Sequence, residues 1–115
     1  MGADQKTETQ GAPAADGGND ITTSLDAFRG QIDRLDAEIV RLLNARATCA
    51  NEIGWLKGRV GMEIYDPARE KAVLQHVRQT NPGPLDGDAV ARVFERIIDE
   101  SRRMERLTTE GRERQ

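Results

Sequence analysis

Aromatic side chains are scarce in this sequence, and it contains one cysteine. Phe, Tyr and Trp make up 3% of the 115 residues, too few for the usual core of a β-sandwich. The composition instead favours a helical protein whose core is built from Leu, Ile and Val. The single cysteine, Cys49, excludes an intrachain disulfide. It lies among the apolar positions of an expected helix, so we predict that it is a small core residue.

Long apolar runs are also missing. No stretch approaches the roughly 20 apolar residues that a membrane-spanning helix needs. No segment has the basic start, apolar middle and small-residue cleavage site of a signal peptide. We therefore expect a cytoplasmic protein that does not bind a membrane.

The motifs of metal, cofactor and covalent chemistry are absent as well. His76 is the only histidine, and it has no Cys or His partners at the spacing of a zinc site. The sequence has no glycine-rich nucleotide loop and no Ser-His-Asp arrangement. We expect neither a metal ion nor a cofactor.

Charge of one sign is not in large excess. The formal net charge is -3, and residues 1–24 account for it with one basic and four acidic residues. The rest of the chain is balanced, so a general attraction to nucleic acid is not supported. Any site for an anion must come from a few basic residues placed together.

The first 24 residues differ in composition from the rest. They are rich in Gly, Ala, Asp and Thr, and Ile21 is their only large aliphatic residue besides the initiator methionine. Such a segment cannot bury enough apolar surface to order itself. We predict a disordered leader over residues 1–24 and one domain over residues 25–115.

Residues 25–57 are predicted to form one very long helix. Ser24 is a good N-cap, and Gly58 and Gly61 can end the helix. Apolar residues recur every three or four positions, at Leu25, Phe28, Ile32, Leu35, Ile39, Leu42, Cys49, Ile53 and Leu56. At ~1.5 Å per residue this helix is about 50 Å long. The rest of a small chain cannot cover its apolar seam, so we expect a homodimer.

Two shorter helices should follow. Asp66 is expected to cap the second helix, with Pro67 as its first helical residue. The sequence NPGP, which begins at Asn81, should end this helix. Asp86 then caps a third helix, which has an apolar stripe from Val90 to Met104. The predicted class is therefore all-α, with three helices in each chain.

Polar residues interrupt the apolar seam of the first helix. Arg46 occupies the slot between Leu42 and Cys49, and it could be a structural arginine paired with a buried acid. Lys57 lies three turns further on nearly the same face, roughly 16 Å along the axis. Two long basic side chains at this spacing can also lean toward one small ligand. Gly30 and Gly54 lie inside the helix, either as tolerated weak spots or as points of close backbone approach.

The other two helices carry comparable groups. Asp66, Arg69 and Glu70 share one face, either as a cap with a surface ion pair or as part of a site. Ser101 and Glu105 lie one turn apart on the apolar stripe of the third helix, where they could also mark a helix edge.

Three segments together resemble the all-helical chorismate mutases. They are LDAFRGQIDRLDAEIVRLLNARATCANEIGWLK, IYDPAREKAVL and VFERIIDESRRME, in this order, and the resemblance covers residues 25–107. It implies an intertwined homodimer of three-helix chains with two equivalent sites. The family's active-site positions fall on Arg29, Arg46, Lys57, Asp66, Arg69, Glu70, Ser101 and Glu105.

The resemblance also implies a reaction. Members of the family convert chorismate, a dianion, to prephenate in one pericyclic step without a cofactor. Lys57 would donate a hydrogen bond to the breaking ether oxygen, and Ser101 would support a carboxylate. Glu70, with the backbone near Asp66, would hold the ring hydroxyl. The best-known bacterial members have glutamine at the position of Glu105, and a glutamate must be protonated to donate in its place.

The resemblance assigns the two substrate carboxylates to Arg29, Arg46 and Arg69. Arg29 precedes Arg46 by about 25 Å along the helix, so one small ligand cannot contact both in a single chain. Arg29 is therefore expected to come from the partner chain. The catalytic residues would be Arg46, Lys57 and Glu105.

The sequence is also compatible with two alternative functions. An isochorismate-pyruvate lyase of the same fold would remove pyruvate from a similar dianion. A non-catalytic helical module would only dimerise or regulate a partner enzyme, although such a module gains nothing from Arg46 in its seam.

Overall fold

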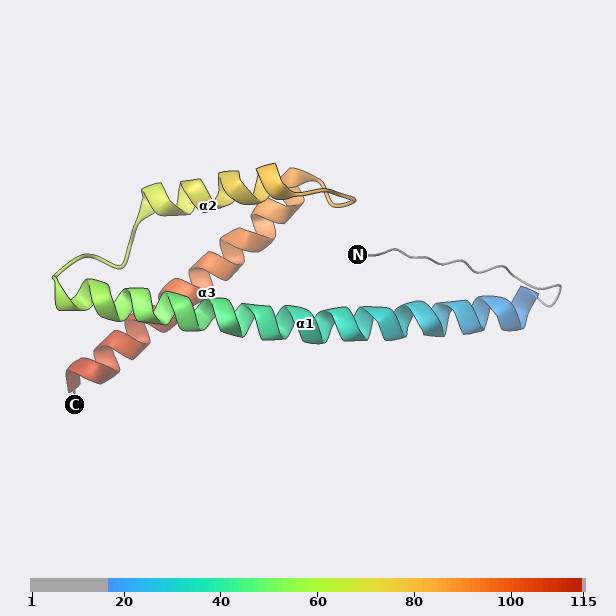
Figure 1. The fold of residues 1–115 in the computed structure, drawn as a ribbon, viewed down its shortest axis with the longest axis horizontal. Coiled ribbons are helices and arrows are strands. Elements are labelled where there is room, and N and C mark those ends of the chain that lie inside the picture. Colours follow the sequence, from blue (N-terminus) through green and yellow to red (C-terminus); the bar gives the residue numbers. More distant parts are fainter. Residues whose placement is uncertain (1–16, 115) are drawn as a thin grey trace. The chain divides into compact units, whose positions relative to one another are not determined.

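A computed structural model describes residues 17–114 of the protein (Figure 1). Three helices make up this described part: α1 (Gly17–Arg59), α2 (Pro67–Thr80) and α3 (Gly87–Arg114). The all-α class is therefore confirmed for these residues. The chain divides into two compact units at Arg41 and Leu42. The second unit contains the end of α1 together with α2 and α3.

The helix α1 begins earlier than the sequence predicted. It starts at Gly17, so the prediction of a disordered leader that reaches residue 24 is wrong for residues 17–24. Asp20 lies in the first turn, where a negative charge complements the helix dipole. Extending a helix adds one hydrogen bond per residue and needs no apolar anchor, so the composition of this segment did not reveal it. The remaining leader, residues 1–16, lies outside the described residues.

The end of α1 follows the prediction. Gly61 has φ +75°, its N–H donates to the carbonyl of Gly58 (3.4 Å), and the N–H of Met62 donates to the carbonyl of Lys57 (2.9 Å). These two bonds form a Schellman motif, in which a left-handed glycine closes the last turn. The motif fixes the backbone around Lys57, which is one of the predicted site residues.

The caps of α2 and α3 also follow the prediction. A carboxylate oxygen of Asp66 accepts a hydrogen bond from the backbone N–H of Arg69 (3.0 Å), and Pro67 is the first helical residue. Asp86 accepts in the same way from the N–H of Ala89 (2.8 Å). Each cap satisfies a backbone donor that the first helical turn leaves unpaired.

The helices α2 and α3 pack against each other and are joined by a turn at one end. Figure 1 shows them diverging toward the start of α2. Their contact buries Val77 of α2 and Ala91 of α3, which are 9% and 2% exposed. These two are the only buried apolar side chains among the residues whose side chains are described, so the core within one chain is small.

The apolar seam of α1 is exposed in the first unit. Phe28, Ile32, Leu35 and Ile39 all keep more than half of their surface accessible. Among the described helices, none is both long and apolar enough to cross a membrane.

Candidate active site

A cavity of about 220 Å³ lies within the second unit, between the last turns of α1, the start of α2 and the middle of α3. Seven of the eight residues predicted for the site line it: Arg46, Lys57, Asp66, Arg69, Glu70, Ser101 and Glu105. Sequence positions up to 59 residues apart, from Arg46 to Glu105, are therefore brought to one place. The eighth residue, Arg29, belongs to the first unit, is exposed, and does not line the cavity.

Arg46 and Ser101 connect α1 to α3. The guanidinium Nη1 of Arg46 donates a hydrogen bond to the hydroxyl of Ser101 (3.1 Å), and both residues are half-buried. A structural arginine would be paired with a buried acid. Within the described residues Arg46 has no carboxylate at salt-bridge distance, so its guanidinium keeps donors for a ligand.

Lys57 faces Asp66 across the cavity. Its Nζ lies 3.8 Å from Oδ2 of Asp66, and the lysine side chain is 17% exposed. This distance is long for a charge-assisted hydrogen bond, which is typically about 2.7–2.9 Å. The other carboxylate oxygen of Asp66 caps α2. The aspartate is thus held by the helix that it caps, while the ammonium group remains available.

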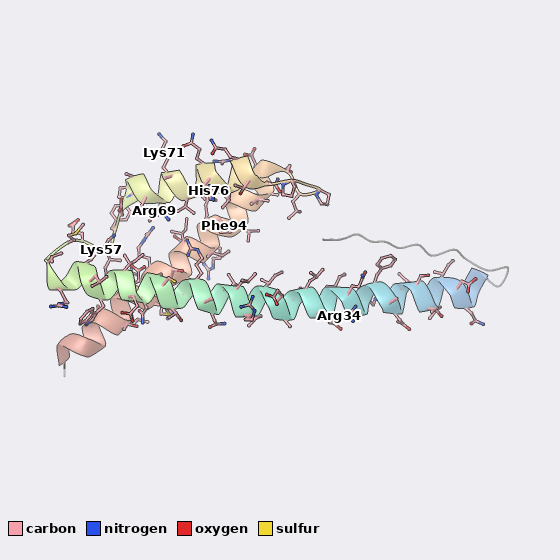
Figure 2. All side chains as sticks on the ribbon, in the orientation of Figure 1. Arg34, Lys57, Arg69, Lys71, His76 and Phe94 are labelled. Atoms are coloured by element: carbon pink, nitrogen blue, oxygen red, sulfur yellow. The ribbon has the colours of Figure 1, made fainter. Side chains whose placement is uncertain are left out.

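Arg69 and Glu70 come from the first turn of α2. Figure 2 shows Arg69 and Lys71 on opposite sides of this helix, and Arg69 lies on the side that carries the cavity. No ion pair of the Arg69 guanidinium is found within residues 17–114. Glu70, in contrast, forms a salt bridge with Arg102 of α3.

Arg102 is a charged residue of the cavity lining that was not predicted from the sequence. Besides pairing with Glu70, its guanidinium lies over the ring of Tyr65, 5.1 Å from the ring centroid. One signal was present in the sequence: Arg102 precedes Glu105 by three positions on a helix, which places the two on neighbouring positions of one face. Its partner on α2 could not be read from the sequence.

Glu105 sits in an unusual electrostatic environment. Burial raises its pKa above the usual value of 4.5, and the positive charges of Lys57, Arg102 and Arg46 oppose that rise without cancelling it. Gly54 of α1 is buried against it: a Cβ at Gly54 would lie 3.1 Å from Cβ of Glu105. Of the two readings for this glycine, close backbone approach is the correct one.

The position of Cys49 differs from the prediction that it is a core residue. It lines the cavity and is exposed, so its assignment as a core residue is wrong. The apolar seam of a helix is buried only where another element covers it, and at Cys49 the seam faces the cavity instead. No cluster of three or more His, Cys, Asp or Glu side chains suited to a metal ion is found within residues 17–114.

The charges around the cavity suit a small dianion. Four cationic side chains line it against three acidic ones, and Asp66 and Glu70 each face one of the cations. With Glu105 protonated, two positive charges remain in excess. The guanidinium groups of Arg46 and Arg69 can bind carboxylates through paired N–H donors. Lys57 and a protonated Glu105 can donate to a neutral oxygen.

Comparisons with known proteins show which family the chain resembles. Residues 28–106 match the chorismate mutase type II family. A bifunctional chorismate mutase/prephenate dehydratase of Neisseria gonorrhoeae is 47% identical over 81 residues, which are 70% of this chain and 22% of that protein. The chain thus spans about a fifth of the length of the bifunctional relatives that it matches.

Shorter relatives match over most of their length. A chorismate mutase of Methanocaldococcus jannaschii is 25% identical over 80 residues, which cover 69% of this chain and 81% of that protein. The solved structure of a chorismate mutase from Thermus thermophilus (form II) superposes with a TM-score of 0.71 at 35% identity, over 72% of this chain and 94% of that one. The family match covers more than half of the chain, and the fold agrees with it. The chain therefore belongs to the chorismate mutase type II family.

Proposed function

We propose that this chain catalyses the rearrangement of chorismate to prephenate in the cavity of its second unit. One observation carries the proposal. The guanidinium groups of Arg46 and Arg69 border the same cavity as Lys57 and Glu105, and neither has a carboxylate partner within the described residues. The charge of Arg46 is half-buried and needs compensation, whereas Arg69 is exposed at the rim of the cavity. A dianionic substrate would compensate the first and be bound by both.

The reaction needs a compact conformer more than it needs a reactive group. Chorismate rearranges in one step through a chair-like arrangement, whereas in water it is mostly extended. Arg46 and Arg69, with Ser101 beside Arg46, would fix its two carboxylates at a set separation. Holding the reacting atoms close in this way can lower the barrier by several kcal/mol, within the roughly 7–11 kcal/mol that orientation can contribute.

Hydrogen bonds to the ether oxygen would lower the barrier further. Negative charge develops on this oxygen as the C–O bond breaks. Lys57 and a protonated Glu105 are the donors placed to stabilise it, and donors that are already oriented need no reorganisation during the reaction. The raised pKa of Glu105, caused by its burial, favours the protonated form that this role requires. Glu70 and the backbone near Asp66 would hold the ring hydroxyl.

A homodimer would complete the site. The seam residues of α1 in the first unit, such as Phe28 and Ile32, are exposed, and a second copy of α1 is the element that would cover them. Arg29 does not line the cavity of its own chain. In an intertwined dimer the partner chain would supply it as the third guanidinium for the substrate carboxylates.

The relatives indicate where the product would go. Two of the names, chorismate mutase/prephenate dehydratase and T-protein, belong to proteins several times longer than this chain, because it covers 22% and 21% of them. We therefore place the activity in aromatic amino-acid biosynthesis, with prephenate passed to a later enzyme. A cytoplasmic location stays a prediction.

Product identity is the test of this proposal. Purified protein is incubated separately with chorismate and with isochorismate, and prephenate and pyruvate are quantified by NMR. Prephenate formed from chorismate, with no pyruvate from either substrate, is the expected result. Pyruvate from isochorismate would assign a lyase instead, and no turnover of either substrate would favour a non-catalytic dimerisation module.

A further inference from the structure

We propose that Arg102 is a further positioning residue of this site, which holds the carboxylate of Glu70 in place and adds a positive charge beside Glu105. The inference deepens the proposed chorismate mutase activity and rests on it. Arg102 is not among the positions that the family resemblance assigns to the site.

The contacts of Arg102 define one orientation of its guanidinium. Its Nη2 forms a salt bridge with Oε2 of Glu70, and its carbon Cζ lies 5.1 Å from the ring centroid of Tyr65. A guanidinium that stacks on an aromatic face and binds a carboxylate at its edge uses both of its recognition surfaces. A second acid, Asp99, lies 3.9 Å away and is itself 60% exposed, so it competes weakly.

The salt bridge connects two helices at the cavity. Glu70 belongs to α2 and Arg102 to α3, and both side chains are largely covered, at 28% and 23% exposure. Within the described residues Glu70 has no other ion pair. Without Arg102 its carboxylate would lose the charge that fixes it. Because Glu70 is proposed to bind the ring hydroxyl, substrate binding should weaken.

The charge of Arg102 also acts on Glu105. The cations that lower the pKa of Glu105 are Lys57 and Arg46 from α1 and Arg102 from α3 itself. From the side of α2, the same cavity is lined by Arg69, Glu70 and the cap Asp66. Replacing Arg102 with a neutral residue removes one of the three cations and leaves the negative charge of Glu70 uncompensated. Both changes raise the pKa of Glu105.

These two effects predict separate kinetic changes. Loss of the fixed Glu70 should raise KM. A higher pKa of Glu105 keeps this side chain protonated to higher pH. The midpoint of the decline in kcat/KM should therefore shift to higher pH. A residue that served only to stabilise the fold would lower activity at every pH and would not move this midpoint.

The experiment uses the full chain and six proteins. They are the wild type, Arg102→Met, Arg102→Lys, Arg106→Met, Glu105→Gln and the double variant Glu105→Gln/Arg102→Met. Arg106 is the matched control, because it lies on the same helix, is exposed and does not line the cavity. For each protein kcat and KM for chorismate are measured across pH, and thermal unfolding is recorded to verify folding.

Arg102→Met should raise KM about tenfold, as loss of a hydrogen bond to a charged group typically does, and should move the pH midpoint upward. Arg102→Lys keeps the positive charge but lacks the planar guanidinium with its paired N–H donors. It should raise KM and keep the wild-type midpoint of the pH profile. Arg106→Met should match the wild type. In a Glu105→Gln background, Arg102→Met should raise KM without any pH shift, because glutamine does not titrate.

An Arg102→Met protein whose KM and pH profile equal those of Arg106→Met would overturn the proposal. If Arg102→Met does not fold, the Arg102→Lys variant tests the proposal instead. An unchanged KM of the lysine variant would overturn the proposal equally. Failure of the proposed function is visible separately, because the wild-type protein would then not convert chorismate at all.

Discussion

Gly54 and Glu105 are in direct contact across α1 and α3: a Cβ at position 54 would lie 3.1 Å from Cβ and 3.2 Å from Cγ of Glu105. Real Cβ atoms rarely tolerate such distances, so a larger side chain at position 54 must displace Glu105. The glycine therefore sets where this carboxyl group stands in the cavity. Its weak helix propensity, about 1 kcal/mol less favourable than that of alanine, is the accompanying disadvantage.

Gly54→Ala should consequently lower kcat/KM for chorismate, because Glu105 must give by a few tenths of an ångström. The loss should stay below the roughly hundredfold effect of a 1 Å displacement in a catalytic geometry. The control is Gly111→Ala on α3, where an added Cβ would meet nothing within 4 Å. That variant should keep its activity and melt at the same or a higher temperature. Equal activity of the two alanine variants would show that Gly54 does not position Glu105.

The pH dependence of activity follows from the protonation of Glu105. Burial raises its pKa, and Lys57, Arg102 and Arg46 oppose that rise. If the protonated form is the donor, kcat/KM falls as pH rises through the pKa of Glu105 in the complex. Glu105→Gln donates at every pH, so it should flatten this fall and keep or raise activity at alkaline pH.

Glu105→Ala provides the comparison for that profile. It removes the donor at all pH values and should lose about 10²–10³ in kcat, the usual effect of deleting one such donor. Profiles of kcat/KM against pH for the three proteins make the test. A glutamine variant as inactive as the alanine variant across the range would remove Glu105 from the ether-oxygen role.

Stability should depend on the same proton. The pKa of Glu105 is higher in the folded protein than its usual value of 4.5, so the folded state binds more protons than the unfolded state between the two values. Stability therefore falls as pH rises through that window. Thermal unfolding at a series of pH values should show a smaller fall for Glu105→Gln than for the wild type. Identical slopes would mean that burial does not raise the pKa of this side chain.

Arg29 tests the proposed dimer. An Arg29→Ala chain and an Arg46→Ala chain should each be nearly inactive. Co-refolding them should restore activity to some heterodimers, because one of the two sites then contains both wild-type arginines. Mixtures that remain as inactive as the single variants would exclude a contribution of Arg29 from the partner chain.

Features set by neighbouring residues were predictable from the sequence. The caps at Asp66 and Asp86 and the glycine stop at Gly61 depend on groups within a few positions, and the structure contains all three. The salt bridge of Arg102 with Glu70 joins two helices, and no periodicity reports which side chains meet across a packed pair. It was therefore missed.

The start of α1 at Gly17 shows a different limit. Residues 17–24 lack apolar anchors, and composition alone predicted disorder for them. A helix already nucleated further along the chain can extend through such residues, since each step gains one backbone hydrogen bond. The place of Arg29 depends on a second chain and stays a prediction.

The central claim is that this cavity rearranges chorismate through a preorganised donor at Lys57. The most direct measurement is prephenate formation from chorismate by the wild type, by Lys57→Met and by the control Lys71→Met. Lys71 is exposed and lies on the side of α2 opposite Arg69 (Figure 2). Wild type and control should form prephenate at the same rate, and Lys57→Met should lose about 10²–10³ in kcat while remaining folded. Undiminished prephenate formation by Lys57→Met would contradict the account.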